Sequence, residues 1–314
     1  MLGRTASNLF WMGRYMERAE NVARLTEVGH RLSLTPDVGP GYREDWQATL
    51  AAAGCPNPAA VGLTKLESDT VQKYLLFDRK NPSSVASCLE AARTNGRSVR
   101  TALTREVWEA LNAAWIEFAA FRSDDIRPDR LPELLDWVRQ KTSLFRGAVQ
   151  GTLLHDEGYR FLQLGNFIER SDNTARILDA RYSVLLPTTE AAGGERGMYQ
   201  WETILRSVSA HRSYRYVYKD RYRPRQVAEF LILRKEMPRS LRYSQDHVRR
   251  ALNGLAAITG GGGASLALAE EASGKLRDLD IPAIVKRGLH EFLTEYLRVT
   301  AEIADTAATD YHFN

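Results

Sequence analysis

Cysteine and long apolar runs are both scarce in this chain. Only Cys55 and Cys88 occur among 314 residues, and their spacing is not that of a metal site. Two separated cysteines favour a reduced compartment over a disulfide framework. No apolar run reaches the ~18 residues of a membrane span, and residues 1–7 do not resemble a signal peptide. We therefore expect a cytoplasmic protein without a membrane partner.

The sequence also lacks the common motifs of catalysis and cofactor binding. It contains no HExxH, CxxC or GxSxG. Glycines 260–263 are not followed by Lys and Ser/Thr, so they predict a joint between helices rather than a phosphate loop. Glu17-x-x-Glu20 and Glu169-x-x-Asp172 have no histidine in phase, and neighbouring arginines would repel a cation. We expect no metal site and no cofactor bound by this chain itself.

Lysine is rare, whereas arginine is abundant. Arginine supplies 35 of the 43 basic residues, and the net charge is only +4. Residues 212–250 hold 12 basic residues against Asp220, Glu229, Glu236 and Asp246. Such a segment suits an acidic protein, a nucleotide or nucleic acid. We do not expect nucleic-acid binding, because the charge of the whole chain is too mild for strong phosphate tracking.

The pattern of apolar residues predicts helices throughout, with no strand-rich block. The fold class is therefore all-α, a multi-helix bundle. We treat residues 1–314 as a single domain, with a candidate subdivision at the 187–197 linker into a repeat-bearing bundle (1–186) and a basic helical block (198–314). Thr5 or Ser7 is expected to cap the first helix, and Asn81 a later one. Helices are predicted at 7–33, 43–53, 61–77, 83–100, 103–123, 132–153, 157–185, 198–219, 224–235, 238–258, 265–278 and 282–308.

One motif occurs twice, 152 residues apart. Residues 13–25 and 165–177 share Gly, Glu-Arg, Asn and Ala-Arg in register, which indicates an internal duplication of a Gly-x-x-x-Glu-Arg-x-[Glu/Asp]-Asn-x-Ala-Arg helix. On a helix the charged residues and the asparagine gather on one face. Gly13 and Gly165 begin that face, and glycine at both places indicates close approach by another backbone or a ligand.

Two interpretations of this face remain open. A Glu/Arg/Asn stripe is most often a solvated surface with weak i,i+4 pairs. Repetition of the same residues at the same offsets instead favours a buried or cleft-facing polar network. Such a network either fixes the packing register through Arg–carboxylate pairs or binds a ligand.

The chain resembles the alpha-E family, bacterial all-helical proteins named for an "ER" motif, over nearly its whole length. Asn166 departs from this family, which often has Arg there, and Thr94-Asn95-Gly96 replaces a more usual Glu-Asn-Ala. The resemblance is carried by four blocks: Ala6-x-Asn8-Leu9-Phe10-Trp11-x-Gly13-Arg14-Tyr15-x-Glu17-Arg18-Ala19-Glu20-Asn21-x-Ala23-Arg24; Asn81-Pro82-Ser83-Ser84 with Ala92-Arg93, Arg97, Val99-Arg100 and Trp108-Glu109-x-Leu111-Asn112; Phe161-Leu162-x-Leu164-Gly165 through Arg176; and Trp201, Leu205 to Ala210, Tyr214-Arg215, Phe230-Leu231 and Pro238 to Arg242.

The resemblance implies an association with circularly permuted ATP-grasp proteins and transglutaminase-like peptidases. ATP-grasp enzymes join a carboxylate to an amine with ATP and Mg, so it implies a role in forming or modifying an amide or peptide. We therefore expect an accessory or catalytic partner of an ATP-grasp amide ligase that binds a small amino-acid or peptide substrate.

Two roles are assigned to the charged residues on this hypothesis. Glu17 and Glu169 either orient the arginines or act on an amine as catalytic residues. The alternative is a non-catalytic helical scaffold whose ER helices form structural ion pairs. The predicted substrate-binding residues are Arg14, Arg18, Asn21, Arg24, Arg170, Asn173, Arg176, Arg97, Arg100, Arg206, Arg215 and Arg239.

Overall fold

The structure is a computed structural model that describes the chain except for residues 34–40, 124–126, 128, 186–194, 220–221 and 314. The described part contains helices and no strand, which confirms the predicted all-α, multi-helix class. Its first half comprises α1 (Gly3–Ser33), α2 (Gly41–Ala52), η1 (Pro58–Val61), α3 (Ser68–Leu76), α4 (Val85–Ser98), η2 (Arg100–Ala102), α5 (Arg105–Phe118) and α6 (Leu131–Thr152). Its second half comprises α7 (Glu157–Leu185), α8 (Glu195–Ser207), α9 (His211–Tyr218), α10 (Pro224–Ile232), α11 (Leu241–Thr259), α12 (Ala264–Asp278), α13 (Ile281–Arg287) and α14 (Leu289–Asp310).

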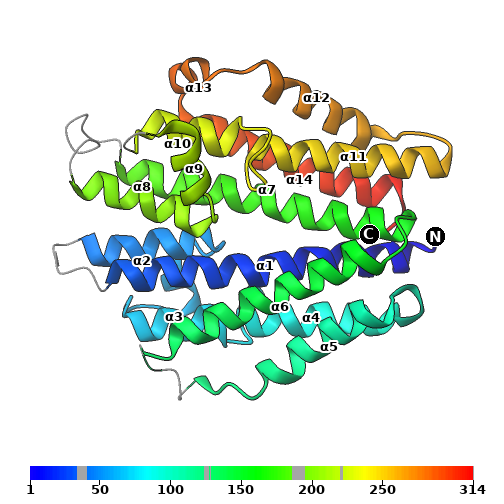
Figure 1. Cartoon of the computed structure of the whole chain (residues 1–314), viewed down its shortest axis with the longest axis horizontal. Helices are drawn as coiled ribbons and strands as arrows, with labels where there is room; N and C mark the ends of the chain where they lie inside the picture. Colours follow the sequence, from blue (N-terminus) through cyan, green and yellow to red (C-terminus); the bar gives the residue numbers. More distant parts are fainter. Residues whose placement is uncertain (34–40, 124–126, 128, 186–194, 220–221, 314) are drawn as a thin grey trace.

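The two helices that carry the repeated motif, α1 and α7, lie side by side at the centre of the bundle (Figure 1). Helices α3 to α6 lie on one side of this pair, and α11, α12 and α14 lie on the other (Figure 1). The amino group of Met1 pairs with Glu157 at 2.9 Å, so α1 and α7 begin close together. Further along both helices, Glu17 of α1 pairs with Arg170 of α7, which shows that the two helices run in the same direction.

Local hydrogen bonds explain several helix starts, but not all as predicted. The hydroxyl of Ser84, not the side chain of Asn81, accepts from the backbone of Ser87 at the start of α4. The side chain of Asn81 accepts one turn earlier, from the backbone of Ser83. The first helix begins at Gly3, so Thr5 and Ser7 lie inside it and neither is its cap. These predictions were wrong because several Ser, Thr and Asn residues near a helix start are equally suited to cap it.

Several predicted helices are shorter than expected or divided; α5, for example, ends at Phe118 rather than near residue 123. The prediction of 61–77 was wrong before Ser68, because Gly62 adopts a φ of 82° after η1. The predicted 198–219 helix divides into α8 and α9 at Ser209, whose φ is 54°. The predicted 282–308 helix divides into α13 and α14 at Gly288, whose φ is 99°. The predicted glycine joint connects α11 to α12, where Gly260 ends α11 with a φ of 83°.

Two apolar clusters form the interior, and each includes residues from both sides of the predicted linker. The first unites α1 and α4 to α6 with Val248, Leu252 and Ile303. The second unites Leu25 and Leu178 with residues of α8 to α14. Most of the 187–197 linker lies outside the described residues, and α8 begins at Glu195, so the subdivision stays a prediction. Within the described residues, no helix combines the length and apolar character needed to span a membrane.

Candidate functional site

Gly13 and Gly165 lie where the backbones of α1 and α7 approach each other closely. A Cβ on Gly13 would lie 2.3 Å from the carbonyl oxygen of Leu162, and one on Gly165 would lie 2.0 Å from that of Phe10. Each glycine therefore packs against the carbonyl of the residue that lies three positions before the other glycine, Leu162 before Gly165 and Phe10 before Gly13. This reciprocal contact is the close backbone approach that the repeated glycines predicted.

The Glu-Arg pairs that follow the glycines are exchanged between the two helices. Arg170 donates to Glu17 through Nε (3.0 Å to Oε1) and Nη2 (2.7 Å to Oε2). Arg18 donates to Glu169 through Nε (2.6 Å to Oε1) and Nη2 (2.8 Å to Oε2). Both carboxylates are buried. The structure thus places the four charged residues in a buried polar network rather than on a solvated surface.

The network around Glu17 is closed by an arginine from a distant segment. Arg239, just before α11, donates from Nη1 to Glu17 Oε1 (2.8 Å) and to Asn21 Oδ1 (3.0 Å). Its Nη2 donates to Glu20 Oε1 at 2.7 Å. Arg24 and Arg146 also donate to Glu20. A space of only about 10 Å³ remains between Glu17 and the residues of α6 and α7 around it.

The network around Glu169 opens instead onto a cavity of about 200 Å³. Its wall contains the predicted residues Arg14, Arg18, Asn173 and Arg176. It also contains Asp172 and Ser83, which were not predicted to bind a ligand. We call this space the Glu169 cavity; its lining is completed by Glu169, Val22, Ala52, Ala53 and Gly54.

The three arginines of the Glu169 cavity are held by carboxylates but keep donors to spare. Arg14 donates to Glu169 through Nε alone (2.9 Å), and Arg176 holds Asp172 through Nε (2.7 Å) and Nη2 (3.1 Å). Within the described residues, no hydrogen bond engages either terminal nitrogen of Arg14, or Nη1 of Arg18 or Arg176. Three cations facing two carboxylates leave the cavity with a net positive charge.

The carboxylates of both networks are held in their ionised form. Burial by itself would raise the pKa of Glu17, but Arg170 and Arg239 outweigh it and hold that pKa well below its usual range. For Glu20 burial is likewise outweighed, chiefly by Arg239, and its pKa falls to about 2. The pKa of Glu169 is lowered in the same way by Arg18 and Arg14. A carboxylate of low pKa is a weak base, so the geometry suits positioning of arginines better than proton abstraction.

These low pKa values predict acid lability. A carboxylate whose pKa is lower in the folded state contributes stability that is present above its unfolded pKa of about 4.5 and is lost as pH falls through the folded value. We therefore expect the free energy of unfolding, measured with urea, to fall steeply from pH 4.5 towards pH 2. A free energy that stays constant across this range would contradict the ionised networks.

Four predicted site residues lie elsewhere. Arg97, Arg100, Arg206 and Arg215 neither line the Glu169 cavity nor pair with the carboxylates of the Glu17 network, so the structure does not bring them together with the other predicted residues. All are exposed: Arg100 stacks on Trp108, and Arg206 pairs with Glu202 one turn away. The apolar faces of α4, α8 and α9 turn towards the interior, which directs Arg97, Arg206 and Arg215 to solvent.

Glu20, Asp172 and Arg146 were missed as members of the networks. Glu20 and Asp172 occupy the same position of the repeat, so the duplication contained the signal that could have identified them. Arg146 lies on α6, outside the repeat, and no local pattern marks it. Within the described residues, no three His, Cys, Asp or Glu side chains come together as metal ligands would.

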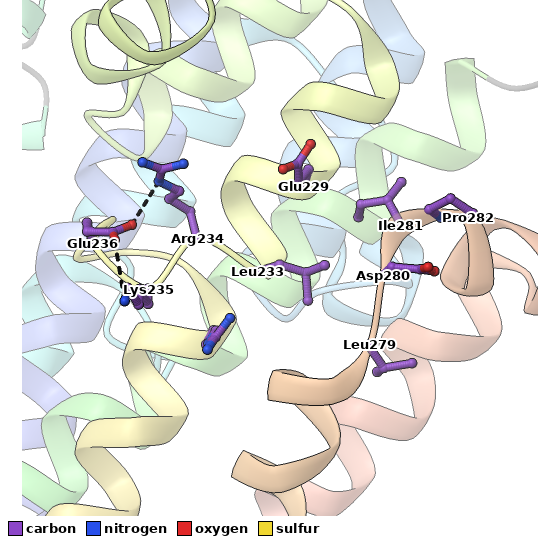
Figure 2. Close-up of a pocket in the computed structure, with 10 residues that line it drawn as sticks. Glu229, Leu233, Arg234, Lys235, Glu236, Leu279, Asp280, Ile281 and Pro282 are labelled. Atoms are coloured by element: carbon purple, nitrogen blue, oxygen red, sulfur yellow. Dashed lines mark ion pairs between the residues drawn. The ribbon is translucent and has the colours of Figure 1, made fainter.

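A larger cavity, of about 690 Å³, lies in the basic segment between α10, the start of α11 and the α12–α13 turn. Arg234 pairs with Glu236 at 2.8 Å, and Lys235 lies 4.0 Å from the same carboxylate (Figure 2). Across the space stand Leu279, Asp280, Ile281 and Pro282 (Figure 2). Its wall contains none of the residues predicted for the site, and its cations are largely matched by carboxylates.

Comparison with known proteins gives the chain a family but no activity. It is 26% identical over 277 residues to Uncharacterized protein Rv2567 of Mycobacterium tuberculosis, covering 82% of this chain and 30% of that protein. Uncharacterized protein Mb2597 of Mycobacterium bovis is 27% identical over the same coverage. The chain thus spans less than a third of the length of these relatives. No solved structure matches it.

The family comparison covers the whole architecture described above. Residues 1–312 match the model of Alpha-E, described as "a predicted alpha-helical domain with a conserved ER motif". The two ER dipeptides of the repeated motif are Glu17-Arg18 and Glu169-Arg170, whose side chains pair between α1 and α7. The chain belongs to the Alpha-E family.

Proposed function

We propose that this chain is the substrate-binding partner of an ATP-grasp amide or peptide ligase. The observation that carries the proposal is the Glu169 cavity, where Arg14, Arg18 and Arg176 face one space of about 200 Å³ with unused donors. Arginine binds carboxylates through paired N–H groups, which makes a small carboxylate-bearing molecule the best ligand class. Pockets for drug-sized molecules are larger, about 300–1,000 Å³, so the space suits a molecule of amino-acid size.

The arginines are organised before any ligand arrives. Glu169 fixes Arg14 and Arg18, and Asp172 fixes Arg176, so little side-chain entropy remains to be lost on binding. On this proposal Glu169 positions the arginines. The low pKa of Glu169 supports that role over proton transfer.

The ligase part of the proposal comes from the family resemblance. An ATP-grasp partner would supply ATP, Mg and the activation of a carboxylate, and a transglutaminase-like peptidase is a further candidate partner. This chain would hold one of the molecules to be joined. The curated relatives are uncharacterized and about three times longer than the match, so the partnership is a proposal.

Binding can be tested with a matched pair of arginines. Arg176 pairs with Asp172 four residues before it, and Arg206 pairs with Glu202 in the same way but outside the cavity. Arg176→Gln is expected to weaken the binding of N-acetylglycine, measured by calorimetry, by about tenfold, and Arg206→Gln to leave it unchanged. Equal effects of the two changes, or no binding by the parent chain, would argue against the cavity as the site.

The ligase role needs a separate measurement. The purified chain is mixed with a circularly permuted ATP-grasp protein from the same organism, ATP, Mg and a mixture of amino acids. We expect co-purification and release of ADP that depends on this chain, with an amide product detected by mass spectrometry. ADP release that is unchanged by omitting the chain would contradict the partnership.

A scaffold role is the second candidate, and the closed Glu17 network favours it. Arg239 and Arg146 bring the segment before α11 and the helix α6 onto α1, and almost no space remains there for a ligand. A scaffold is expected to gain no thermal stability from carboxylates or amino acids, whereas a binding subunit is stabilised by its ligand.

A further inference from the structure

The two networks differ by one guanidinium group. Arg239 is held by Glu17, Glu20 and Asn21. The residues 152 positions later are Glu169, Asp172 and Asn173, and all three line the Glu169 cavity. Within the described residues, no arginine from outside α1 and α7 lines this cavity in the way that Arg239 enters the Glu17 network. The cavity is therefore lined by the counterparts of the three residues that accept hydrogen bonds from Arg239 in the Glu17 network.

The carboxylate oxygen of Glu169 that corresponds to the Arg239 acceptor on Glu17 has an unused lone pair. Glu17 Oε1 accepts from both Arg170 Nε and Arg239 Nη1. Among the described residues, the corresponding Glu169 Oε1 accepts from Arg18 Nε alone. One lone pair of Glu169 Oε1 thus remains for a donor in the position equivalent to that of Arg239 beside Glu17.

Asn173 gives an independent indication. Its counterpart Asn21 accepts from Arg239 through Oδ1. Asn173 is only 8% exposed and lines the Glu169 cavity, yet its side-chain amide has no hydrogen-bond partner within the described residues. Neither polar atom of this amide is fully enclosed, so both its acceptor and its donors are free to bind a ligand in the cavity.

The charge of the cavity does not forbid a cation. Around Glu17 and Glu20, four arginines (Arg24, Arg146, Arg170 and Arg239) share two carboxylates. Around Glu169 and Asp172 there are three, namely Arg14, Arg18 and Arg176. One more guanidinium would give the second network the same ratio of guanidinium groups to carboxylates as the first.

We propose that the Glu169 cavity binds the guanidinium group of an arginine-like amino acid or short peptide. The guanidinium occupies the place equivalent to that of Arg239, on Glu169 Oε1, Asn173 and Asp172. The ligand's carboxylate meets the spare donors of Arg14, Arg18 and Arg176, and this second contact rests on the function proposed above. A planar guanidinium suits the site because it donates to several acceptors at once.

The test compares three ligands by calorimetry on the full chain. L-arginine carries both groups, L-citrulline replaces the guanidinium by a neutral urea of similar shape, and agmatine lacks the carboxylate. We expect arginine to bind at least about tenfold more tightly than citrulline, with agmatine in between. Asn173→Ala is expected to remove most of the preference for arginine over citrulline, and Asn173→Asp to increase it. Asn253→Ala, on the exposed face of α11, is the control.

The outcomes separate this inference from the proposed function. Equal affinity for arginine and citrulline would overturn the guanidinium site and leave the carboxylate site standing. Binding of agmatine as tight as that of arginine, together with no binding of N-acetylglycine, would support the guanidinium site and overturn the carboxylate contact. Failure of these three ligands and of N-acetylglycine to bind at about 10 mM would overturn both. Thermal unfolding of each variant shows whether a lost preference reflects lost folding.

Discussion

Glu17→Gln is expected to lower the free energy of unfolding by about 3–5 kcal/mol. Glu17 is buried and accepts hydrogen bonds from Arg170 and Arg239, which are buried as well. The neutral amide would leave two guanidinium groups facing each other without their shared anion. Breaking a buried pair costs more than the pair contributes, because the remaining charges cannot return to water.

Glu169→Gln is the matched comparison, and we expect a smaller loss of about 1–2 kcal/mol. Glu169 is equally buried, but the side chains of its partners Arg14 and Arg18 are 18% and 22% exposed and face the cavity, where water can solvate them. Urea unfolding at pH 7 measures both values. A loss for Glu169→Gln as large as that for Glu17→Gln would contradict the contrast between a closed and an open network.

Gly165→Ala is the second change with a large expected effect, a loss of about 3 kcal/mol or more. The new Cβ would stand 2.0 Å from the carbonyl oxygen of Phe10, which belongs to the backbone of α1 and cannot turn aside. The central helices would have to separate, and the exchanged Glu-Arg pairs beyond this point would lengthen with them. Gly13→Ala is expected to behave alike, because its Cβ would meet the carbonyl oxygen of Leu162 at 2.3 Å.

The control for this change is another helical glycine. Gly147 lies on the exposed side of α6, and a Cβ there would meet no atom within 4 Å. Gly147→Ala is therefore expected to stabilise the chain by about 0.5–1 kcal/mol, since alanine is the better helix former. Thermal and urea unfolding of the variants compare the two positions. A stable Gly165→Ala protein would contradict the close approach of α1 and α7.

The helical class followed from the sequence because apolar periodicity is a local property. Predictions failed where one residue alters the backbone: Gly62, Ser209 and Gly288 each adopt a positive φ and interrupt a pattern that otherwise continues as helix. The prediction of the cap residue was wrong for a related reason. Asn81 and Ser84 are both of a type that caps helices, and only the geometry of the turn selects Ser84.

The candidate site was predictable only in part. The repeat identified the glycines, the exchanged glutamate and arginine residues and both asparagines, because their identity and spacing are visible in one chain. Arg97, Arg100, Arg206 and Arg215 were grouped with Arg239 as an extension of the site, and the sequence does not say which of these arginines point inwards. Arg146 could not have been chosen on local grounds, since its partner Glu20 lies 126 residues away.

The presence of two copies of one charged helix face could be predicted from the residues alone. The difference between the copies is visible only in the folded chain. Arg239, 222 residues from Glu17, fills one copy, while the other faces a cavity. The physical reason is that burial and charge pairing depend on which distant segments meet, whereas helix formation and the spacing of side chains on a helix depend on neighbours in the chain.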